Sequence, residues 1–260
     1  MSHEIDLSFL DLPEILELVF PLAYSNFYFS SCSQPPSYME IAEGTRIGYG
    51  LWRKSRSSPT ILYFHGNGET PGDYSEIANF YNQRNINLFV ASYRGYGLST
   101  GSPTITSLLR DSHSILREFK KIIEKEGFEK KLFLMGRSLG SIPAMELAYH
   151  HQMEFSGIII ESGLANNFRR WWRYLKPRDR EFILNENGEF LNKVKARAIK
   201  IPALIIHGEY DSIIPYSEGK ELYENLASKD KKLLIIPGAD HNDLMTELYF
   251  KAIEEFIAKV

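Results

Sequence analysis

Residues 132–140 read Leu-Phe-Leu-Met-Gly-Arg-Ser-Leu-Gly, and this stretch is the most informative in the chain. It holds the pattern Gly-x-Ser-x-Gly between a short apolar run and a segment, 139–150, whose pattern predicts a helix. A serine at such a sharp strand-to-helix turn is held out of the sheet. Glycines two positions away on either side let the strand and the helix approach closely. We therefore predict that Ser138 is a nucleophile, the alternative being a chance pentapeptide.

Strand patterns and helix patterns alternate on both sides of this stretch. We predict strands at residues 38–42, 46–52, 60–64, 88–92, 132–135, 157–160, 203–206 and 233–236. We predict helices at residues 13–19, 139–150, 217–226 and 244–258, and a long one between Ser102-Pro103 and Gly127. The first two strands are expected to form a hairpin. The six later strands are continuous apolar runs, typical of parallel strands covered by helices on both faces. The fold class is therefore α/β, with a mostly parallel sheet flanked by helices.

Composition narrows the function classes. The chain has 260 residues, 30 of them basic and 33 acidic, and a single cysteine, Cys32. The charge balance argues against a nucleic-acid-binding protein, and one cysteine excludes both an internal disulfide and a multi-cysteine zinc site. The apolar stretch 12–29 is interrupted by prolines and charges, and the residues before it are acidic. We therefore expect no signal peptide and no integral membrane segment, and a soluble, cytoplasmic protein.

The segment 164–200 breaks the alternation, because connections in α/β units usually have about 2–6 residues outside the helix. It carries ten basic and four acidic residues, a net charge of +6. We predict a lead-in segment at 1–36, a core formed by 37–163 and 201–260, and a helical cap insertion at 164–200. The aromatic side chains of the insertion suit an acyl pocket, and we assign Trp171, Trp172 and the loop residue Gly66 to the substrate pocket. Its arginines suit an anionic ligand or a membrane surface. The alternative is that the tryptophans pack on the sheet and the arginines face water.

A serine nucleophile needs a base, and the base needs an acid that orients it. In this strand–turn–helix architecture, the order along the chain is serine, acid, histidine. His241 lies in a loop just after the strand at 233–236, where the base belongs. His207 also ends a strand, but it precedes the best acid. His150 and His151 lie about 18 Å from Ser138 along the following helix, which is too far. We therefore predict that His241 is the base.

Four acidic residues are candidates for the third member of the triad. Asp211 follows the strand at 203–206 and is our choice, although an aspartate in such a loop is often an ordinary turn residue. Asp240, Glu161 and Glu209 are the alternatives. Asp240 directly precedes His241, so its backbone geometry makes pairing with that ring awkward.

The oxyanion that forms during acyl transfer needs two preorganised amide donors. We expect one to be the N–H of Leu139, immediately after the nucleophile. The other is expected to be the N–H of Asn67, in the loop His65-Gly66-Asn67-Gly68. His65 is expected to bond the loop backbone rather than act as the base. This chemistry requires no cofactor and no metal.

From residue 37 to residue 260 the chain resembles the α/β-hydrolase superfamily, and within it the Bem46-like serine hydrolases, near the depalmitoylating ABHD17-type proteins. The motifs that carry the resemblance are His65-Gly66-Asn67, Tyr93-Arg94-Gly95-Tyr96-Gly97-Leu98-Ser99, Gly136-Arg137-Ser138-Leu139-Gly140, His207-Gly208 with Asp211 and Ile214-Pro215, and Gly238 with His241-Asn242. The resemblance implies an eight-stranded sheet and hydrolysis of an ester or a thioester. Ser138, Asp211 and His241 match the triad. Asn67 and Leu139 match the oxyanion positions. The cysteine-rich N-terminal motif of the membrane-bound relatives is absent, which argues against membrane anchoring and protein depalmitoylation.

We therefore expect a serine hydrolase that cleaves a small-molecule carboxylic ester or thioester through an acyl-serine intermediate. The alternative enzyme is a serine peptidase or an aminoacyl-ester hydrolase, because the same triad cleaves amides. A noncatalytic binding protein of this fold is the alternative from another class. It is disfavoured because such proteins typically lack a member of the triad.

Overall fold

The computed structural model describes residues 8–21, 37–129, 131–167, 172–185 and 191–260. Its strands are β1 (Ser37–Ala42), β2 (Thr45–Trp52), β3 (Thr60–Phe64), β4 (Asn87–Ala91), β5 (Leu132–Arg137), β6 (Gly157–Glu161), β7 (Ala203–Gly208) and β8 (Lys231–Ile236). Its α-helices are α1 (Pro13–Val19), α2 (Ile77–Gln83), α3 (Ile105–Glu126), α4 (Ser141–His151), α5 (Pro177–Asn185), α6 (Asn192–Ala196), α7 (Tyr216–Asn225) and α8 (Glu247–Lys259). Short 3₁₀ turns lie at η1 (Ser8–Leu10), η2 (Pro71–Tyr74), η3 (Ser138–Gly140), η4 (Gln152–Glu154) and η5 (Trp172–Tyr174).

The eight strands form one sheet in the order β1-β2-β4-β3-β5-β6-β7-β8. β1 and β2 form the expected antiparallel hairpin, β2 pairs antiparallel with β4, and the remaining pairs are parallel. The predicted α/β-hydrolase fold with a mostly parallel, eight-stranded sheet is confirmed. The register sets Phe64 opposite Gly136 and Arg137 opposite Glu161. The loops that follow the parallel strands therefore meet at one edge of the sheet, which is where ligands bind in open α/β sheets.

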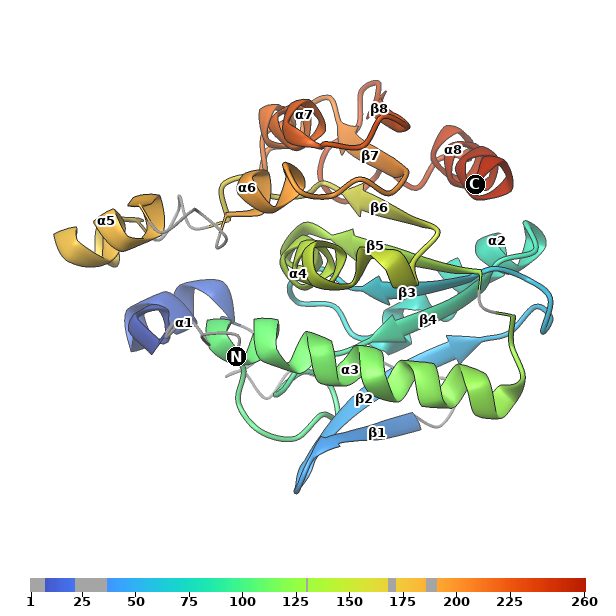
Figure 1. Ribbon diagram of the computed structural model, residues 1–260, viewed down its shortest axis with the longest axis horizontal. Helices are drawn as coiled ribbons and strands as arrows, with labels where there is room; N and C mark the ends of the chain where they lie inside the picture. The colour runs from blue at the N-terminus through green and yellow to red at the C-terminus, as the bar shows by residue number, and fades with distance from the viewer. Residues whose placement is uncertain (1–7, 22–36, 130, 168–171, 186–190) are drawn as a thin grey trace.

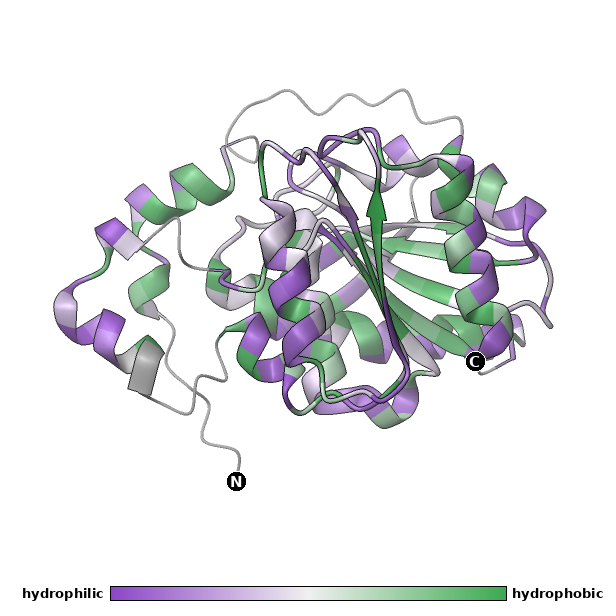
Figure 2. Cartoon of the chain, turned by 90° about the horizontal axis from the view of Figure 1, so that it is seen from above, coloured by the Kyte–Doolittle hydropathy of each residue, from purple (hydrophilic) through white to green (hydrophobic). Residues whose placement is uncertain are grey.

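Two apolar cores lie on opposite faces of this sheet. Leu62 and Phe64 of β3 face the core beneath α3, α4, α6 and α7, whereas Ile61 and Tyr63 face the core beneath α2 and α8. Figure 1 shows the two groups of helices on either side of the strands. Figure 2 shows the strands as a hydrophobic layer between helices that carry hydrophilic residues as well. Because both faces are buried, the central parallel strands β3 to β7 are apolar along most of their length, whereas the edge strand β8 begins with Lys231-Lys232 and is partly exposed.

The ends of the long helix α3 follow from its capping residues. The Thr104 side chain accepts a hydrogen bond from the Ser107 N–H at 2.9 Å, and the Ser107 Oγ accepts one from the Thr104 N–H at 2.8 Å. This reciprocal pair is a capping box. At the other end Gly127 adopts a φ of +72°, the left-handed conformation that ends helices. The predicted end at Gly127 is confirmed, whereas the helix begins at Ile105, two residues after the predicted start at Ser102-Pro103, because Thr104 provides the cap.

Some local predictions differ from the structure. The segment after Ser138 begins as the 3₁₀ turn η3 and becomes α4 only at Ser141. α2 was not predicted from the pattern, because it buries only Ala78 and Tyr81, which is too short a stripe to stand out. Within the segment 164–200, α6 packs against α4 and α7, so the end of the segment lies on the core. The division into core and cap stays a prediction. Among the described residues, no helix combines the length and the hydrophobicity needed to cross a bilayer.

The helix α1 packs on the same face of the sheet as α3. It buries Ile15 and Val19, and Phe20 next to it is fully buried. The Phe20 ring meets the Tyr96 ring edge-on, with centroids 6.3 Å apart. The Asp11 carboxylate accepts a hydrogen bond from the Thr106 N–H at the start of α3, at 3.1 Å. The described part of the N-terminal segment is therefore docked on the core, a point that its sequence pattern does not decide.

Candidate active site

Ser138 lies at the sharp turn between β5 and the helix that follows. Its φ is +52°, a left-handed conformation that is rare for a residue with a side chain. A Cβ on Gly140 would overlap the carbonyl oxygen of Phe64, and a Cβ on Gly136 would overlap the carbonyl oxygen of Gly140. Both positions of the motif therefore require glycine, because a side chain at either one would prevent the close contact of β5, β3 and the start of the helix. This strained turn holds the serine at the carboxyl edge of the sheet.

The structure brings Ser138, His241 and Asp211 together in one hydrogen-bonded chain. The His241 Nε2 lies 3.1 Å from the Ser138 Oγ, and the His241 Nδ1 lies 2.7 Å from the Asp211 Oδ2. All three side chains are buried. Because a carboxylate only accepts, the hydrogen on the ring lies at Nδ1, and the Nε2 lone pair faces the serine hydroxyl. The arrangement is suited to removing a proton from Ser138.

Asp211 is held as a charged, fixed acceptor. Its Oδ1 accepts hydrogen bonds from the N–H groups of Ile213 at 3.0 Å and Ile214 at 2.7 Å. The His207 Nε2 lies 3.3 Å from its other oxygen. Burial raises the pKa of Asp211, but hydrogen bonds from His207 and His241 outweigh burial, so the pKa lies well below the usual range of an aspartate. Asp211 is therefore ionised near neutral pH.

The other three acids considered from the sequence have different partners. Glu161 binds the Arg137 guanidinium at 3.0 Å, and Glu209 accepts the Gly238 N–H at 2.9 Å. Asp240 accepts the N–H and the hydroxyl of Ser212 at 2.7 and 2.9 Å. Of the four acids, Asp211 is the one whose carboxylate contacts the His241 ring.

The loop after β3 is fixed next to this serine. The Asn67 side chain donates to the Val19 carbonyl at 2.7 Å and accepts from the Tyr96 hydroxyl at 2.6 Å. The Gly66 N–H donates to Glu69 at 2.7 Å, so this amide has a partner other than the oxyanion. The Asn67 side chain is thus engaged at both ends, and the role of its backbone N–H as an oxyanion donor stays a proposal. Leu139, the other expected donor, is the second residue of η3 and directly follows Ser138.

His65 has a structural setting. Its ring is fully buried, with Nδ1 2.8 Å from the Gly66 carbonyl and Nε2 3.3 Å from the Ser92 hydroxyl. Burial lowers the pKa of His65 below the usual value of a histidine. The Tyr93 hydroxyl donates to the His65 carbonyl at 2.6 Å. His65 therefore ties the loop to its surroundings, and its ring nitrogens are engaged there rather than at Ser138.

Arg137 links the loops that carry these residues, and the sequence analysis did not single it out. Its guanidinium pairs with Glu161 and with Glu69, the same carboxylate that accepts the Gly66 N–H. It also donates to the carbonyl of His241 at 2.9 Å and to the Asn242 side chain at 2.8 Å. Burial lowers the pKa of Arg137, but the two carboxylates outweigh burial and raise it. The arginine is therefore a permanent cation that connects the loop after β3, the end of β6 and the loop that carries His241.

Below this cation lies a group of buried tyrosines. The Tyr249 hydroxyl donates to Glu161 at 2.7 Å, and the Tyr74 hydroxyl donates to Glu69 at 2.6 Å. Burial raises the pKa of Tyr249 and Tyr74 well above that of a free tyrosine. Both therefore act as neutral donors that satisfy the carboxylates. Of the residues in this network, the sequence singled out only Glu161, as an acid at the end of a strand.

The structure describes two of the three residues assigned to the substrate pocket, Gly66 and Trp172. Gly66 lies beside the Arg137 guanidinium, where a Cβ would contact it. Trp172 is partly buried and packs against the core on the face of α3 and α4. The Arg180 guanidinium lies 5.9 Å from the Trp172 ring centroid. Trp171 lies outside the described residues. The assignment of these residues to a pocket stays a proposal.

The chain matches one protein family, and it is similar to several known proteins and solved structures. The family model described as "Serine aminopeptidase, S33" matches residues 55–176 and 184–248. Protein bem46 of Schizosaccharomyces pombe is 32% identical over 212 residues, which are 78% of this chain and 68% of that protein. Alpha/beta hydrolase domain-containing protein 17C of Mus musculus is 28% identical over 228 residues, 85% of this chain and 67% of that protein. Among solved structures, a monoacylglycerol lipase of Paleococcus ferrophilus shares the fold with a TM-score of 0.61 at 20% identity, covering 82% of this chain and 98% of the lipase.

Proposed function

Because this chain belongs to the α/β-hydrolase family described as serine aminopeptidase, S33, we propose that it hydrolyses carboxylic esters or thioesters through an acyl-serine intermediate. The observation that carries the proposal is the hydrogen-bonded chain from Ser138 through His241 to Asp211, with contacts of 3.1 and 2.7 Å. The lipase among the structural neighbours shows the fold alone and leaves the substrate open.

In the proposed mechanism, the His241 Nε2 takes the proton of the Ser138 hydroxyl as Oγ attacks the acyl carbon. The oxygen of the tetrahedral intermediate receives hydrogen bonds from the N–H groups of Leu139 and Asn67. His241 then gives its proton to the departing alcohol or thiol, which leaves an acyl-serine. A water molecule, deprotonated by the same ring, attacks the acyl carbon and releases the acid. Asp211 stays ionised throughout and stabilises the charged ring.

The test is hydrolysis of p-nitrophenyl esters from acetyl to palmitoyl by the wild type and by Ser138→Ala. We expect turnover with at least one chain length and a loss of about 10⁴-fold or more in Ser138→Ala. Ser114→Ala is the matched control, because Ser114 contacts Arg117 on the exposed side of α3. A Ser138→Ala protein that is as active as Ser114→Ala would refute the proposed nucleophile.

A second candidate is an aminopeptidase or aminoacyl-ester hydrolase, which the description of the matching family favours. The same three residues would cleave an amide, so the two candidates differ in leaving group and not in the nucleophile. Aminoacyl p-nitroanilides tested beside the esters distinguish them: a larger kcat/KM on the anilides favours the peptidase. Absence of turnover, together with no labelling of Ser138 by a phosphonate, would instead favour a noncatalytic binding protein.

The charge of the segment 164–200 supports a narrower proposal on substrate class. The described basic side chains there include Arg173, Lys176 and the largely exposed Arg178. Cations close to an acyl site favour donors with an anionic group, such as a phosphate on the leaving thiol. Comparison of an acyl-CoA with a neutral thioester of the same acyl chain tests it, since equal kcat/KM values at low salt would contradict the proposal.

The single cysteine supports a cytoplasmic location.

A further inference from the structure

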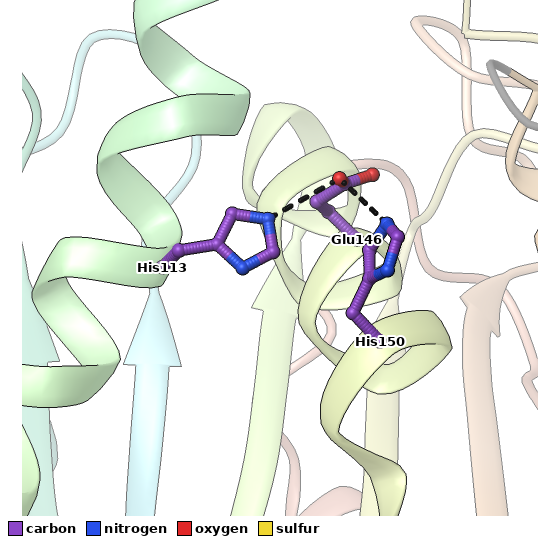
Figure 3. A group of neighbouring side chains, drawn as sticks. All are labelled: His113, Glu146 and His150. Carbon is purple, nitrogen blue, oxygen red and sulfur yellow. Dashed lines mark hydrogen bonds and ion pairs between the residues drawn. The ribbon is translucent and has the colours of Figure 1, made fainter. Parts of the chain in front are cut away.

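A second group of side chains with ligand chemistry lies between α3 and α4. His113 comes from α3, and Glu146 and His150 come from α4. Glu146 and His150 are four residues apart, so they share one face of their helix. Figure 3 shows the three side chains pointing toward one another across the space between the helices. The group is remote from Ser138, because His150 lies at the far end of α4, about 18 Å along the helix.

The three ligand atoms already have the spacing of a metal site. The Glu146 Oε1 lies 3.3 Å from the His113 Nε2 and 3.2 Å from the His150 Nε2. All three atoms lie within 4.8 Å of one another. Ligands about 2.0–2.1 Å from a tetrahedral zinc ion lie about 3.3–3.4 Å apart. Two edges of the ligand triangle therefore match zinc as they stand, and a fourth coordination position is left open.

The hydrogen bonds around His113 supply an independent argument. The His113 Nδ1 lies 2.9 Å from the His151 Nε2, and the His151 Nδ1 lies 3.2 Å from the Glu154 Oε1. Carboxylates only accept, so without an ion the His113 Nε2 and the His151 Nδ1 must both carry hydrogen. The bond between the rings then needs a third hydrogen, one more than two neutral imidazoles hold.

Either a proton that makes one ring an imidazolium or a metal ion on the His113 Nε2 removes this mismatch. The His113 Nδ1–H then donates to the His151 Nε2, and the His151 Nδ1–H donates to Glu154. With the ion, every contact is satisfied with one hydrogen on each ring. A metal-binding histidine that donates its other N–H to a fixed acceptor is the usual outer-shell arrangement of metal sites.

The charges beside the group set the expected affinity. The second oxygen of Glu146 pairs with the buried ammonium of Lys195, which leaves Oε1 to the ion. The Lys120 ammonium pairs with Glu154 at 2.5 Å. The two lysines partly offset the negative charge, so we expect micromolar binding rather than the tight binding of an all-thiolate site.

We propose that His113, Glu146 and His150 bind a zinc ion that joins α3 to α4, outside the catalytic site. Nitrogen and carboxylate ligands with an open position suit zinc better than magnesium or calcium, which prefer oxygen ligands. The ion would connect two helices of one face, and would take no part in the proposed hydrolysis.

The experiment is isothermal titration calorimetry. The full chain is first treated with a chelator and dialysed, and it is then titrated with zinc chloride. We expect one ion per chain in the wild type, and a loss of affinity of about tenfold or more in His113→Gln and His150→Gln. The outer-shell variant His151→Gln should lose about tenfold. Glu118→Gln, on the exposed side of α3, should bind like the wild type. Zinc at a concentration 100 times its Kd should raise the Tm of the wild type by about 5–10 °C.

Cobalt(II) provides the second readout. Tetrahedral cobalt gives strong visible absorption bands, which should appear with the wild type and disappear in His150→Gln. His150 is 45% exposed, so its replacement should leave the fold and the ester hydrolysis unchanged. The absence of binding would overturn the proposal. Binding that survives in both His113→Gln and His150→Gln would overturn it too, because the ion would then lie at another site, such as His241.

Discussion

Replacement of Arg137 by methionine should lower both the stability and the activity of this protein. Methionine keeps much of the length of the side chain but removes the charge and all of its donors. The guanidinium is 7% exposed, and its partner Glu161 is 1% exposed. Loss of one partner from a buried pair leaves an uncompensated charge, which costs about 3–5 kcal/mol. That is a large part of a typical unfolding free energy of about 5–15 kcal/mol.

The effect on activity follows from the other contacts of Arg137. Its donors hold the His241 carbonyl and the Asn242 side chain at 2.9 and 2.8 Å. Without them, the loop that carries the base loses two anchors. A displacement of a reacting group by about 1 Å costs about 100-fold in rate, so we expect kcat to fall by about that factor. KM should change little, because Arg137 is not expected to contact the substrate.

The assay combines urea unfolding with ester kinetics in a double-mutant cycle with Glu161→Gln. Glu161→Gln removes the orphaned charge, so the double variant should be more stable than Arg137→Met alone. Arg137→Lys keeps the charge but reaches fewer acceptors, and it should recover more stability than activity. A loss of under about 1 kcal/mol in Arg137→Met would refute the buried-charge argument. Unchanged kcat in a folded Arg137→Met would refute the positioning role.

Two further predictions concern Asp211, and a third concerns Gly140 in the turn that carries Ser138. Asp211→Asn should lower kcat by about 10³–10⁴-fold with little change in KM, which steady-state kinetics on the preferred ester checks; a loss under about tenfold would favour another acid. The pKa of Asp211 is depressed in the folded chain, so its contribution to stability is complete above about pH 4 and is lost as the pH falls further. Urea unfolding should therefore show a gap in stability between wild type and Asp211→Asn that narrows below pH 4, and a gap that widens there would contradict the shift. Gly140→Ala should fail to fold or lose nearly all activity, since its Cβ would overlap the Phe64 carbonyl. Circular dichroism and phosphonate labelling check it, and a folded, fully labelled variant would show that the turn tolerates a side chain.

The sequence predicted the centre of the sheet well because its strands there are buried on both faces. The run at 60–64 is continuously apolar and coincides with β3, and Gly127 ends α3 as its position suggests. The Gly-x-Ser-x-Gly motif selected Ser138, and the chain order together with a position just after a strand selected His241; the structure places the His241 Nε2 3.1 Å from the Ser138 Oγ. These predictions depend on local patterns and on one topological rule.

Other features could not be predicted, because they depend on contacts between distant residues. Arg137 occupies a variable position of the motif, and its partners Glu69 and Glu161 lie 68 and 24 residues away. The spacing of Glu146 and His150 is visible on one helix, but His113 joins them only when α3 packs on α4. The acid was ambiguous for the same reason, since four carboxylates lie at or just after the ends of strands β6, β7 and β8, which end at the same edge of the sheet.

The hydrogen bond from the Asn67 side chain to the Val19 carbonyl has a consequence for how such chains diverge. The acceptor is a main-chain atom, so nearly any residue at position 19 supplies it. The exposed side chains of α1 can therefore change over evolutionary time, and the buried Ile15 and Val19 can be replaced by other apolar residues, while the loop beside the serine keeps its anchor. A chimera that takes its first twenty residues from a distant relative would preserve this anchor if the backbone path is kept. It would lose the anchor after a one-residue insertion in α1 that moves the carbonyl away from Asn67, even if every side chain of the helix were kept.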